Sequence, residues 1–432
     1  MQRYAECSPS QAKWLGTLPS HWDCKKIGSL FAERKVKVSD KDYEPLSVTK
    51  MGILPQLEDA AKSNDGDNRK LVRAGDFVIN SRSDRKGSCG VSELDGSVSL
   101  INLTLIPREQ WNRRYVHYLL RSQPFSEEYY RNGRGIVADL WTTRYSEMKS
   151  ILLPVPPRSE QDQIVRFLDW KISSINELIN IKHGQLNIVK ELLNRVFRDI
   201  SLEHSKRVKI KYLFGLENDF FVPDASELYS KAGMYNRGRG IFLREQCPGN
   251  ELGDSQFQHI HPDCLMLSGQ FAWEDAVYIT QEKDSVGIAS HRYYLLKPTK
   301  DVSVEYLWAY FLSYEGSFNL QRCSHGSAGR NRPLNIKEVL DLELPVPDDL
   351  GAVKTLNKLV RDYMRLQVIT RKERTNLIDL RTLLIADTVT GKIDVRNITV
   401  PEYEFVDEDV DADKESSEDE SEENDDFNGV EE

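Results

Sequence analysis

The clearest pattern along the chain is a heptad repeat of apolar residues between positions 158 and 204. Steps of three and four alternate without a slip, and one charged residue interrupts the series Val165, Leu168, Ile172, Ile175, Ile179, Lys182, Leu186, Val189, Leu193, Val196 and Ile200. This spacing places the side chains on one face of a helix and is typical of a coiled-coil seam. It predicts a helix of about 40 residues, roughly 60 Å long. Ser159 should cap its start, with Asp162 completing a capping box.

A second seam follows 191 residues later, in register with the first. Its positions are Leu359, Tyr363, Leu366, Thr370, Glu373, Leu377, Leu380 and Leu384. The acids Asp348 and Asp349 suit the start of this helix, and Gly391 suits its end. Two long helices of similar length predict an antiparallel coiled coil. Lys182 and Glu373 then lie near the two midpoints, and we hypothesise an ion pair between them that fixes register. In the alternative, each side chain reaches water independently.

The helices belong to a longer internal repeat. The same offset of 191 aligns Pro154 with Pro345, Tyr115-Val116 with Tyr306-Leu307, and Gly135 with Gly326. Upstream, Lys26–Phe31 aligns with Lys209–Phe214 at an offset of 183, so the second copy is eight residues longer. Four matches in order indicate a tandem repeat.

Each repeat begins with a globular part in which short strand-like runs alternate with Gly and Asn/Asp turns and one helical segment. We therefore predict an α+β fold with two globular domains in tandem. Each domain is followed by a long helix, and the two helices pair. The predicted parts are 1–157 (first domain with the N-terminal segment), 158–204 (first helix), 205–347 (second domain), 348–400 (second helix and end segment) and 401–432 (tail).

Basic residues gather in Gly-rich loops of both repeats. In the first they are Arg82, Arg85, Lys86, Arg131, Arg134 and Arg144, and in the second they are Arg237, Arg239, Arg330 and Arg332. The forked guanidinium group suits phosphates and guanine edges, and glycine allows close approach of the backbone. Trp141, Tyr145 and Tyr235 stand nearby. These loops are candidate DNA contacts; the alternative for each Arg is a solvated surface charge.

The net charge of −10 hides two opposite parts. Residues 401–432 contain 17 acids and one base, whereas residues 1–400 contain 57 bases and 51 acids, a net of +6. The tail is a run of like charge and is predicted to be disordered. The tail is either a solvated acidic segment with no further role, or it competes with DNA for the basic loops. No apolar run reaches the ~18 residues that span a bilayer, and six scattered cysteines favour reduced thiols. We expect a cytoplasmic protein without a membrane anchor.

Three segments resemble the specificity subunit (HsdS) of Type I restriction–modification systems. They are WLGTLPSHWDCKKIGSLF (14–31), LLPVPPRSEQDQIVRFLDWKISSINELI (152–179) and LIDLRTLLIADTVTGKIDV (377–395), within a likeness that covers about residues 10–400. The run 389–395 is the most specific piece. The second copy departs from the pattern, because Leu350-Gly351-Ala352 replaces the Ser-Glu-Gln run.

The resemblance implies two target-recognition domains, each reading one half of a split, asymmetric site in double-stranded DNA. The paired helices would act as a spacer and dock two methyltransferase subunits. Those subunits would carry S-adenosylmethionine and methylate a flipped adenine. Separate restriction subunits would use ATP and Mg. This chain would carry no cofactor and no catalytic group.

Enzyme motifs are weak in this sequence. The single Pro-Pro, Pro156-Pro157, lacks the flanking residues of an adenine methyltransferase motif. Asp139, Glu147 and Lys149 are spaced too tightly for a nuclease triad, and His259 with His261 lacks a third metal ligand nearby. The alternative function belongs to another class of protein: a coiled-coil adaptor that joins two globular heads without DNA specificity. Binding to duplex DNA separates the two readings.

Overall fold

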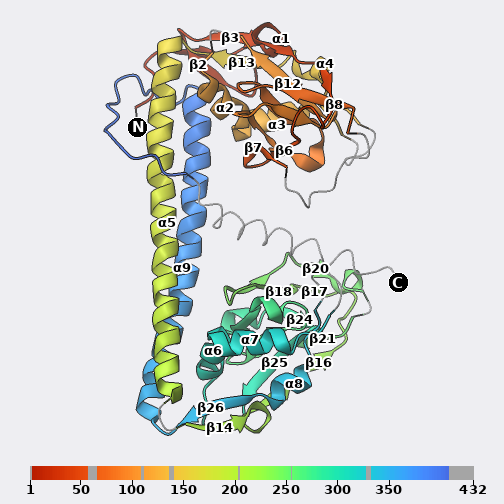
Figure 1. The fold of residues 1–432 in the computed structure, drawn as a ribbon, viewed down its shortest axis with the longest axis vertical. Helices are drawn as coiled ribbons and strands as arrows, with labels where there is room; N and C mark the ends of the chain where they lie inside the picture. Colours follow the sequence, from red (N-terminus) through yellow and green to blue (C-terminus); the bar gives the residue numbers. More distant parts are fainter. Residues whose placement is uncertain are drawn as a thin grey trace. The chain divides into compact units, whose positions relative to one another are not determined.

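The computed structural model describes residues 2–56, 66–108, 111–135, 141–202, 205–253, 255–326 and 332–407. It divides into two compact units. Among the described residues, the first unit comprises 2–179 with 375–407, and the second comprises 180–374. Each contains a globular part and segments of both long helices (Figure 1).

The first unit is built on a four-stranded antiparallel sheet of order β10-β9-β12-β4. Its strands are Cys89–Val91 (β10), Phe77–Asn80 (β9), Asn102–Pro107 (β12) and Phe31–Glu33 (β4). A second sheet, β11-β8-β5, comprises Gly96–Val98, Arg69–Val72 and Lys37–Val38. Three strand pairs are β6–β7 (Leu46–Thr49, Gly52–Pro55), β1–β2 (Cys7–Pro9, Thr17–Pro19) and β3–β13 (Asp23–Lys26, Leu152–Val155). The short helices are Ile27–Leu30 (α1), Ser83–Arg85 (η1), Arg113–Arg121 (α2), Gln123–Arg131 (α3) and Tyr145–Met148 (α4).

The second unit repeats this plan. Its four-stranded sheet, β15-β25-β22-β23, comprises Phe214–Glu217, Tyr293–Pro298, Leu265–Ser268 and Val277–Ile279. The three-stranded sheet, β16-β21-β24, comprises Phe220–Phe221, Phe257–His259 and Ile288–Ser290. Strand pairs are β18–β19 (Ala232–Tyr235, Gly240–Leu243), β17–β20 (Leu228–Tyr229, Cys247–Pro248) and β14–β26 (Ser205–Lys209, Glu343–Pro347). Its short helices are Ile210–Tyr212 (η3), Gly249–Glu251 (η4), Ala272–Glu274 (η5), Glu282–Asp284 (η6), Val304–Leu312 (α6), Tyr314–Arg322 (α7) and Ile336–Asp341 (α8).

Strand order and pairing register agree between the two units. The pair Asn102–Asn80 of the first unit corresponds to Tyr293–Ser268 of the second. Equivalent strands lie 183 residues apart at β4 and β15, 188 apart at β9 and β22, and 191 apart at β12 and β25. The predicted tandem repeat is therefore confirmed. Its eight extra residues enter in two places, five before β22 and three before β25.

The same sequence features build both cores. The central strands β9 and β22 are buried along their whole length, which suits their continuous apolar runs. Helices α2 and α6 begin at polar N-caps: the Asn112 side chain accepts from the backbone N–H groups of Arg114 and Tyr115, and Ser303 accepts from that of Tyr306. Helix α2 then buries one apolar face against the four-stranded sheet, whereas α6 is buried along its whole length.

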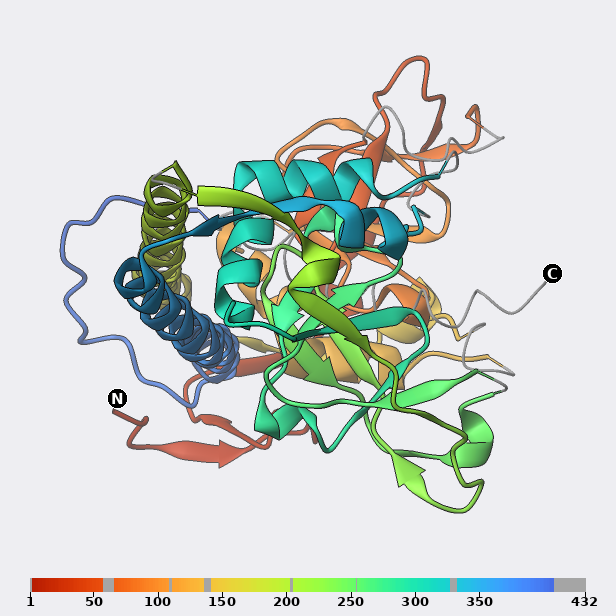
Figure 2. The same ribbon diagram turned by 90° about the horizontal axis from the view of Figure 1, so that it is seen from below.

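Two long antiparallel helices run through the chain, Arg158–Leu202 (α5) and Leu350–Val389 (α9). Within each unit their segments lie side by side (Figure 1, Figure 2). In the first unit Leu168 and Ile175 share a core with Leu384, and in the second Leu193 shares a core with Leu356 and Val360. The predicted antiparallel coiled coil is confirmed.

The observed ends of the long helices agree with only some of the predicted caps. Asp349 accepts from the backbone N–H groups of Gly351 and Ala352 and so caps α9, as predicted. Gly391 follows α9 with a φ of +74°, also as predicted. The capping box on Ser159 is wrong, because α5 already begins at Arg158. Asp162 instead accepts from the Asn112 amide and the Arg158 guanidinium, which lower its pKa.

The buried face of α9 is broader than the predicted seam. Leu359, Leu366 and Leu377 are half-buried, whereas Leu356 and Val360 beside them are fully buried. These two positions face the globular part of the second unit as well as α5, so they bury more surface than a two-helix seam requires. Leu380, assigned to the seam, is 48% exposed, and that assignment is wrong.

Lys182 and Glu373 meet as hypothesised. Both lie in the second unit, with Lys182 Nζ 2.8 Å from Glu373 Oε2 and side chains 34% and 43% exposed. The neighbouring seam residue Leu186 is half-buried. The ion pair is thus present, and its role in fixing register stays a prediction.

The segment 401–407 corrects the predicted boundary of the disordered tail. Its backbone is hydrogen-bonded to Ser173 and Asn176 of α5. These seven residues are therefore part of the first unit. The remaining tail, 408–432, lies outside the described residues.

Candidate nucleic-acid interface

A basic hollow of about 720 Å³ opens on the first unit. We call it the basic hollow, and its charged lining consists of Lys35, Lys70, Arg82, Arg144, Lys149 and one acid, Glu33. Two of these residues, Arg82 and Arg144, were predicted from the Gly-rich loops. The five bases come from three different parts of the sequence, so only the fold brings them together.

Strand-like pairing positions the arginines. Arg82 lies two residues after the end of β9 and forms an isolated antiparallel bridge with Thr142, which also bridges Arg134. The Thr143 N–H donates to the Ser81 carbonyl at 2.9 Å, and the Ser83 N–H donates to the Trp141 carbonyl at 3.1 Å. Bridged residues project to the same face, and Arg144 lies two residues beyond Thr142. Three predicted arginines therefore share one face of the first unit.

Helix α4 forms another wall of the hollow. The Tyr145 hydroxyl donates to the Phe31 carbonyl at 3.1 Å, which fixes α4 to β4. Glu147 accepts from the Arg144 N–H at 3.1 Å and from the Ser146 hydroxyl at 2.8 Å. Its pKa is lowered, first by the Ser146 bond and also by the charge of Arg134. With Glu147 engaged in the cap, the exposed side chains of Arg144 and Lys149 face the hollow.

The floor of the hollow is strongly positive. Lys70 is 15% exposed, donates to the Asn102 carbonyl at 2.7 Å, and lies 4.0 Å from Glu33. Burial lowers its pKa, Glu33 opposes this effect, and the charge of Lys35 adds to it. The Glu33 carboxylate thus lies near both Lys35 and Lys70. An anion in the hollow would therefore meet an excess of positive charge.

An apolar edge completes the hollow. Leu100 and Ile101, in the turn before β12, are each 37% exposed and line it beside Arg82. Guanidinium and ammonium groups suit phosphates, whereas exposed aliphatic side chains suit the apolar faces of sugars and thymine methyl groups. The lining therefore fits a nucleic-acid strand better than a small inorganic anion.

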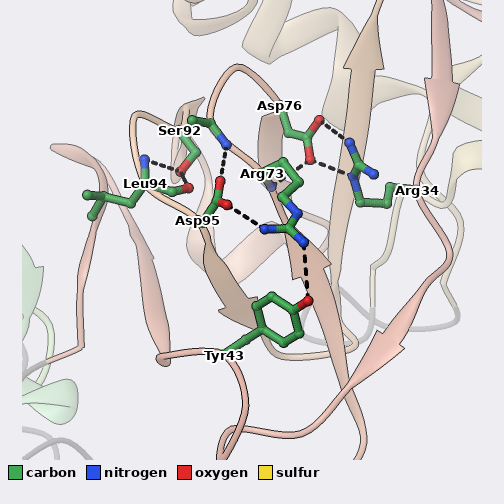
Figure 3. A network of polar contacts seen from close by, with 8 residues as sticks. Arg34, Tyr43, Arg73, Asp76, Ser92, Leu94 and Asp95 are labelled. Carbon is green, nitrogen blue, oxygen red and sulfur yellow. Dashed lines mark hydrogen bonds and ion pairs between the residues drawn. The ribbon is translucent and has the colours of Figure 1, made fainter.

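A network of polar contacts holds the strands that carry these bases (Figure 3). Arg34, between Glu33 and Lys35, makes two hydrogen bonds to the Asp76 carboxylate, at 2.6 and 2.9 Å. Asp76 also accepts from the Arg73 N–H at 2.9 Å. The Arg73 side chain donates to Asp95 and to the Tyr43 hydroxyl. These contacts join the end of β4 to the turn between β8 and β9.

The other predicted bases of the first unit form local ion pairs. Lys86 lies 2.6 Å from Glu127, and Arg131 lies 2.5 Å from Glu128. Arg85 is 69% exposed and lies 3.9 Å from Asp84. None of these three lines the basic hollow, and their role in DNA contact stays a prediction.

In the second unit, the predicted loop of Arg237 and Arg239 is attached to α9. Gln367 donates to the Gly238 carbonyl at 3.0 Å, and Arg371 donates to the Arg239 carbonyl. The Arg371 guanidinium lies 4.2 Å from the Tyr235 ring centroid. Arg239 is half-buried and donates to the Asn236 carbonyl, while Arg237 is exposed with a φ of +60°. The structure gives this loop a packing role at the helix.

The last two predicted bases are Arg330 and Arg332, and the structure describes one of them. The Arg332 guanidinium lies 4.6 Å from the Trp273 ring centroid and remains exposed. Arg330 lies outside the described residues.

Residues of the weak enzyme motifs make other contacts where the structure describes them. Asp139 lies outside the described residues, and Glu147 caps α4. His259 stacks on Phe221 at 4.3 Å, whereas His261 pairs with Asp219 at 2.9 Å. Within the described part of the chain, no group of three or more His, Cys, Asp or Glu side chains is placed to hold a metal ion. No helix among the described residues is long and apolar enough to cross a membrane.

Sequence reasoning missed three lysines of the hollow. Lys35, Lys70 and Lys149 stand outside Gly-rich loops, so loop composition gave no signal. In the run that carries the family resemblance, Glu160 is buried and accepts from the Tyr4 hydroxyl, with His21 Nε2 at 2.8 Å. Gln161 accepts from the Asn112 N–H at 2.9 Å. The run thus binds the N-terminal segment and α2 to α5.

Comparisons with known proteins give structural matches alone. No family model and no curated protein matches the sequence. A chain from a structural study of complex assembly and conformational transition of the type I restriction–modification system is 12% identical, with a TM-score of 0.55. That match covers 87% of this chain and 99% of its own.

Two further structures match with lower scores. The HsdS subunit from Thermoanaerobacter tengcongensis is 13% identical, with a TM-score of 0.43, covering 87% of this chain and 98% of its own. The S subunit of a type I system from M. genitalium is 14% identical, with a TM-score of 0.42, covering 85% and 96%.

Proposed function

Because the chain has an HsdS-like fold, we propose that it is the DNA-reading specificity subunit of a type I restriction–modification complex. Each unit would read one half of a split, asymmetric site in double-stranded DNA. The paired helices would hold the two readers a fixed distance apart. The chain itself would be non-catalytic and act in the cytoplasm.

The observation that carries the proposal is the basic hollow of the first unit. Five bases surround one acid there, and two exposed aliphatic side chains lie beside them. Phosphate contacts supply most of the salt-dependent affinity of DNA-binding proteins, and base-edge contacts supply specificity. The hollow offers both kinds of group within one unit.

Exposed apolar residues on the long helices support the proposed partners. In the first unit these are Leu178, Leu380 and Leu383, and in the second they are Ile181, Ile188, Leu192, Val368 and Ile369. Exposed apolar rows on a helix pair are typical of docking surfaces for further helices. Two methyltransferase subunits would dock there. They would carry S-adenosylmethionine, and restriction subunits would use ATP and Mg.

The test measures binding of the purified chain to duplex DNA over a range of salt. We expect the double variant Arg82→Gln/Arg144→Gln to lose about tenfold or more in affinity at low salt. The slope of log affinity against log salt should fall by about 2, because roughly one counterion is released per phosphate contact.

The matched control is Lys86→Gln/Arg131→Gln, which removes the same charge from two ion-paired positions of the same unit. It should change the slope much less. Equal losses of affinity in both variants would show that net charge alone causes the effect. Unchanged binding of the Arg82→Gln/Arg144→Gln variant would contradict the assignment of the hollow.

A further inference from the structure

The C-terminal segment 401–407, which we call the strap, fixes the end of the described chain to the first unit. The Ser173 hydroxyl donates to the Glu404 carbonyl at 2.9 Å and accepts from the Val406 N–H at 2.9 Å. The Asn176 amide donates to the Val406 carbonyl at 3.1 Å. Both α5 side chains are 3% exposed. The Phe405 ring lies 5.4 Å from the Arg114 guanidinium carbon.

The chain continues beyond the strap with an unusually acidic sequence. Residues 408–432 contain 14 acids and one base, Lys414, a net charge of −13. Fully extended, 25 residues reach about 80 Å. This segment starts on the unit that carries the basic hollow, and its length exceeds the few tens of ångströms of a domain of this size.

The hollow offers a complementary surface on the same unit. Five bases and one acid line it. The equivalent positions of the second unit are Asn218, Gln258, Gln270, Asn335 and Leu340, with no base among them. The second unit has a hollow of about 50 Å³ lined by three bases, Lys231, Arg244 and Arg292. The acidic segment, tethered to the first unit, therefore meets the larger hollow, with five bases, on its own unit.

We propose that residues 408–432 occupy the basic hollow of the first unit when DNA is absent, and that duplex DNA displaces them. The binding site of the tail is inferred from charge complementarity and from the length of the tether, whereas the displacement of the tail by DNA rests on the proposed function. A short flexible tether gives an effective concentration on the order of mM. Weak non-specific DNA contacts then lose the competition, and a full target contact wins it.

The first experiment needs no DNA. The chain is truncated after Asp407, which keeps the strap, and a fluorescent synthetic peptide of residues 408–432 is titrated onto it by anisotropy. We expect binding that weakens as salt rises and that falls at least fivefold with Arg82→Gln/Arg144→Gln. A peptide with every Asp and Glu replaced by Asn and Gln should not bind. No binding, or equal binding to the double variant, would overturn the site.

The second experiment adds random-sequence duplex DNA. At low salt the truncated chain should bind severalfold more tightly than the full chain, and the difference should disappear at high salt. In the Arg82→Gln/Arg144→Gln background the truncation should give no gain. Equal affinity of full and truncated chains would overturn the competition. Peptide binding without any DNA binding would instead contradict the proposed function and leave the tail site standing.

Discussion

The two globular parts share strand order and register, but the five bases of the basic hollow have uncharged counterparts in the second unit. The five bases of the basic hollow correspond to Asn218, Gln258, Gln270, Asn335 and Leu340 in the second unit. Glu33 corresponds to Leu216. The buried strands keep their apolar character because the packing of the sheet requires it, whereas the surface positions are free to change. One scaffold can thus carry two different surfaces, as the proposed asymmetric target would require.

The units also differ in what covers the long helices. In the second unit the hairpin β18–β19 has a four-residue loop, 236–239, whose Gly238 carbonyl accepts from Gln367 of α9. In the first unit the loop of the equivalent hairpin has two residues, 50–51, and its Lys50 carbonyl accepts from Arg121 of α2. The position equivalent to Gln367 is Asn176, which holds the strap. The strap therefore covers a helix face that a longer hairpin covers in the second unit.

The largest expected effect comes from exchanging a whole reader. Replacing residues 20–157 with the corresponding domain of another specificity subunit should change one half-site completely and leave the other intact. Methylated sites in DNA from cells that also express the methyltransferase partner give the readout. The matched exchange of residues 205–347 should change the opposite half. A change in both halves, or in neither, would contradict two independent readers.

The helix contacts predict a smaller effect that stays local to each unit. Asn176→Ala leaves the Val406 carbonyl and an Arg381 N–H without this buried partner, and should cost about 1–3 kcal/mol of the free energy of unfolding. Amide exchange should rise at Val406.

Gln367→Ala in the second unit should cost about 1 kcal/mol of the free energy of unfolding, with faster amide exchange in 236–239. Faster exchange in the strap of the Gln367 variant would show that the two contacts are not independent.

The central ion pair predicts a still smaller effect. Lys182→Glu or Glu373→Lys alone should destabilise the chain by about 0.5–1 kcal/mol, because the pair is partly exposed and screened by water. The double reversal should recover most of this loss, measured by denaturant unfolding. Failure of the double variant to recover would favour two side chains that reach water independently.

The smallest effect concerns a turn that the units build differently. Gly87 of the first unit corresponds to Asp275 of the second, and both have left-handed backbones, with φ of +81° and +58°. Burial raises the pKa of Asp275, and a hydrogen bond from Ser317 opposes it. Because the folded state holds this proton more tightly, stability falls as pH rises from the unfolded pKa through the folded pKa.

Asp275→Asn should therefore stabilise the second unit at neutral pH by about 1 kcal/mol or less, since Asn also tolerates this backbone. The gain should grow with rising pH in the acid range and vanish below the unfolded pKa. Thermal unfolding at several pH values measures it, and a gain that is largest in acid would contradict the sign.

Local periodicity predicted the architecture but left the candidate site incomplete. The seam from Leu168 to Leu193 and the 191-residue repeat follow from spacing, which the sequence displays directly. Lys35, Lys70 and Lys149 meet Arg82 only through strand pairing over long sequence distances, so composition of single loops gave no sign of them. Arg239 shows the converse, because packing of its loop against α9 leaves this base half-buried.

The strap was missed for a related reason. The acidic composition of residues 401–432 indicated disorder and hid the apolar residues at its start. The strap is held by hydrogen bonds between its backbone and the side chains of Ser173 and Asn176, whereas Tyr403 and Phe405 stay exposed. The side-chain pattern of the strap therefore gave no signal of its docking.

The most direct measurement is a map of methylated adenines in DNA from cells that express this chain with the proposed methyltransferase partner. We predict one split motif whose two halves differ in sequence and are separated by a spacer of fixed length. Methylation that does not depend on this chain, or a continuous or palindromic motif, would contradict two different readers held apart by the paired helices.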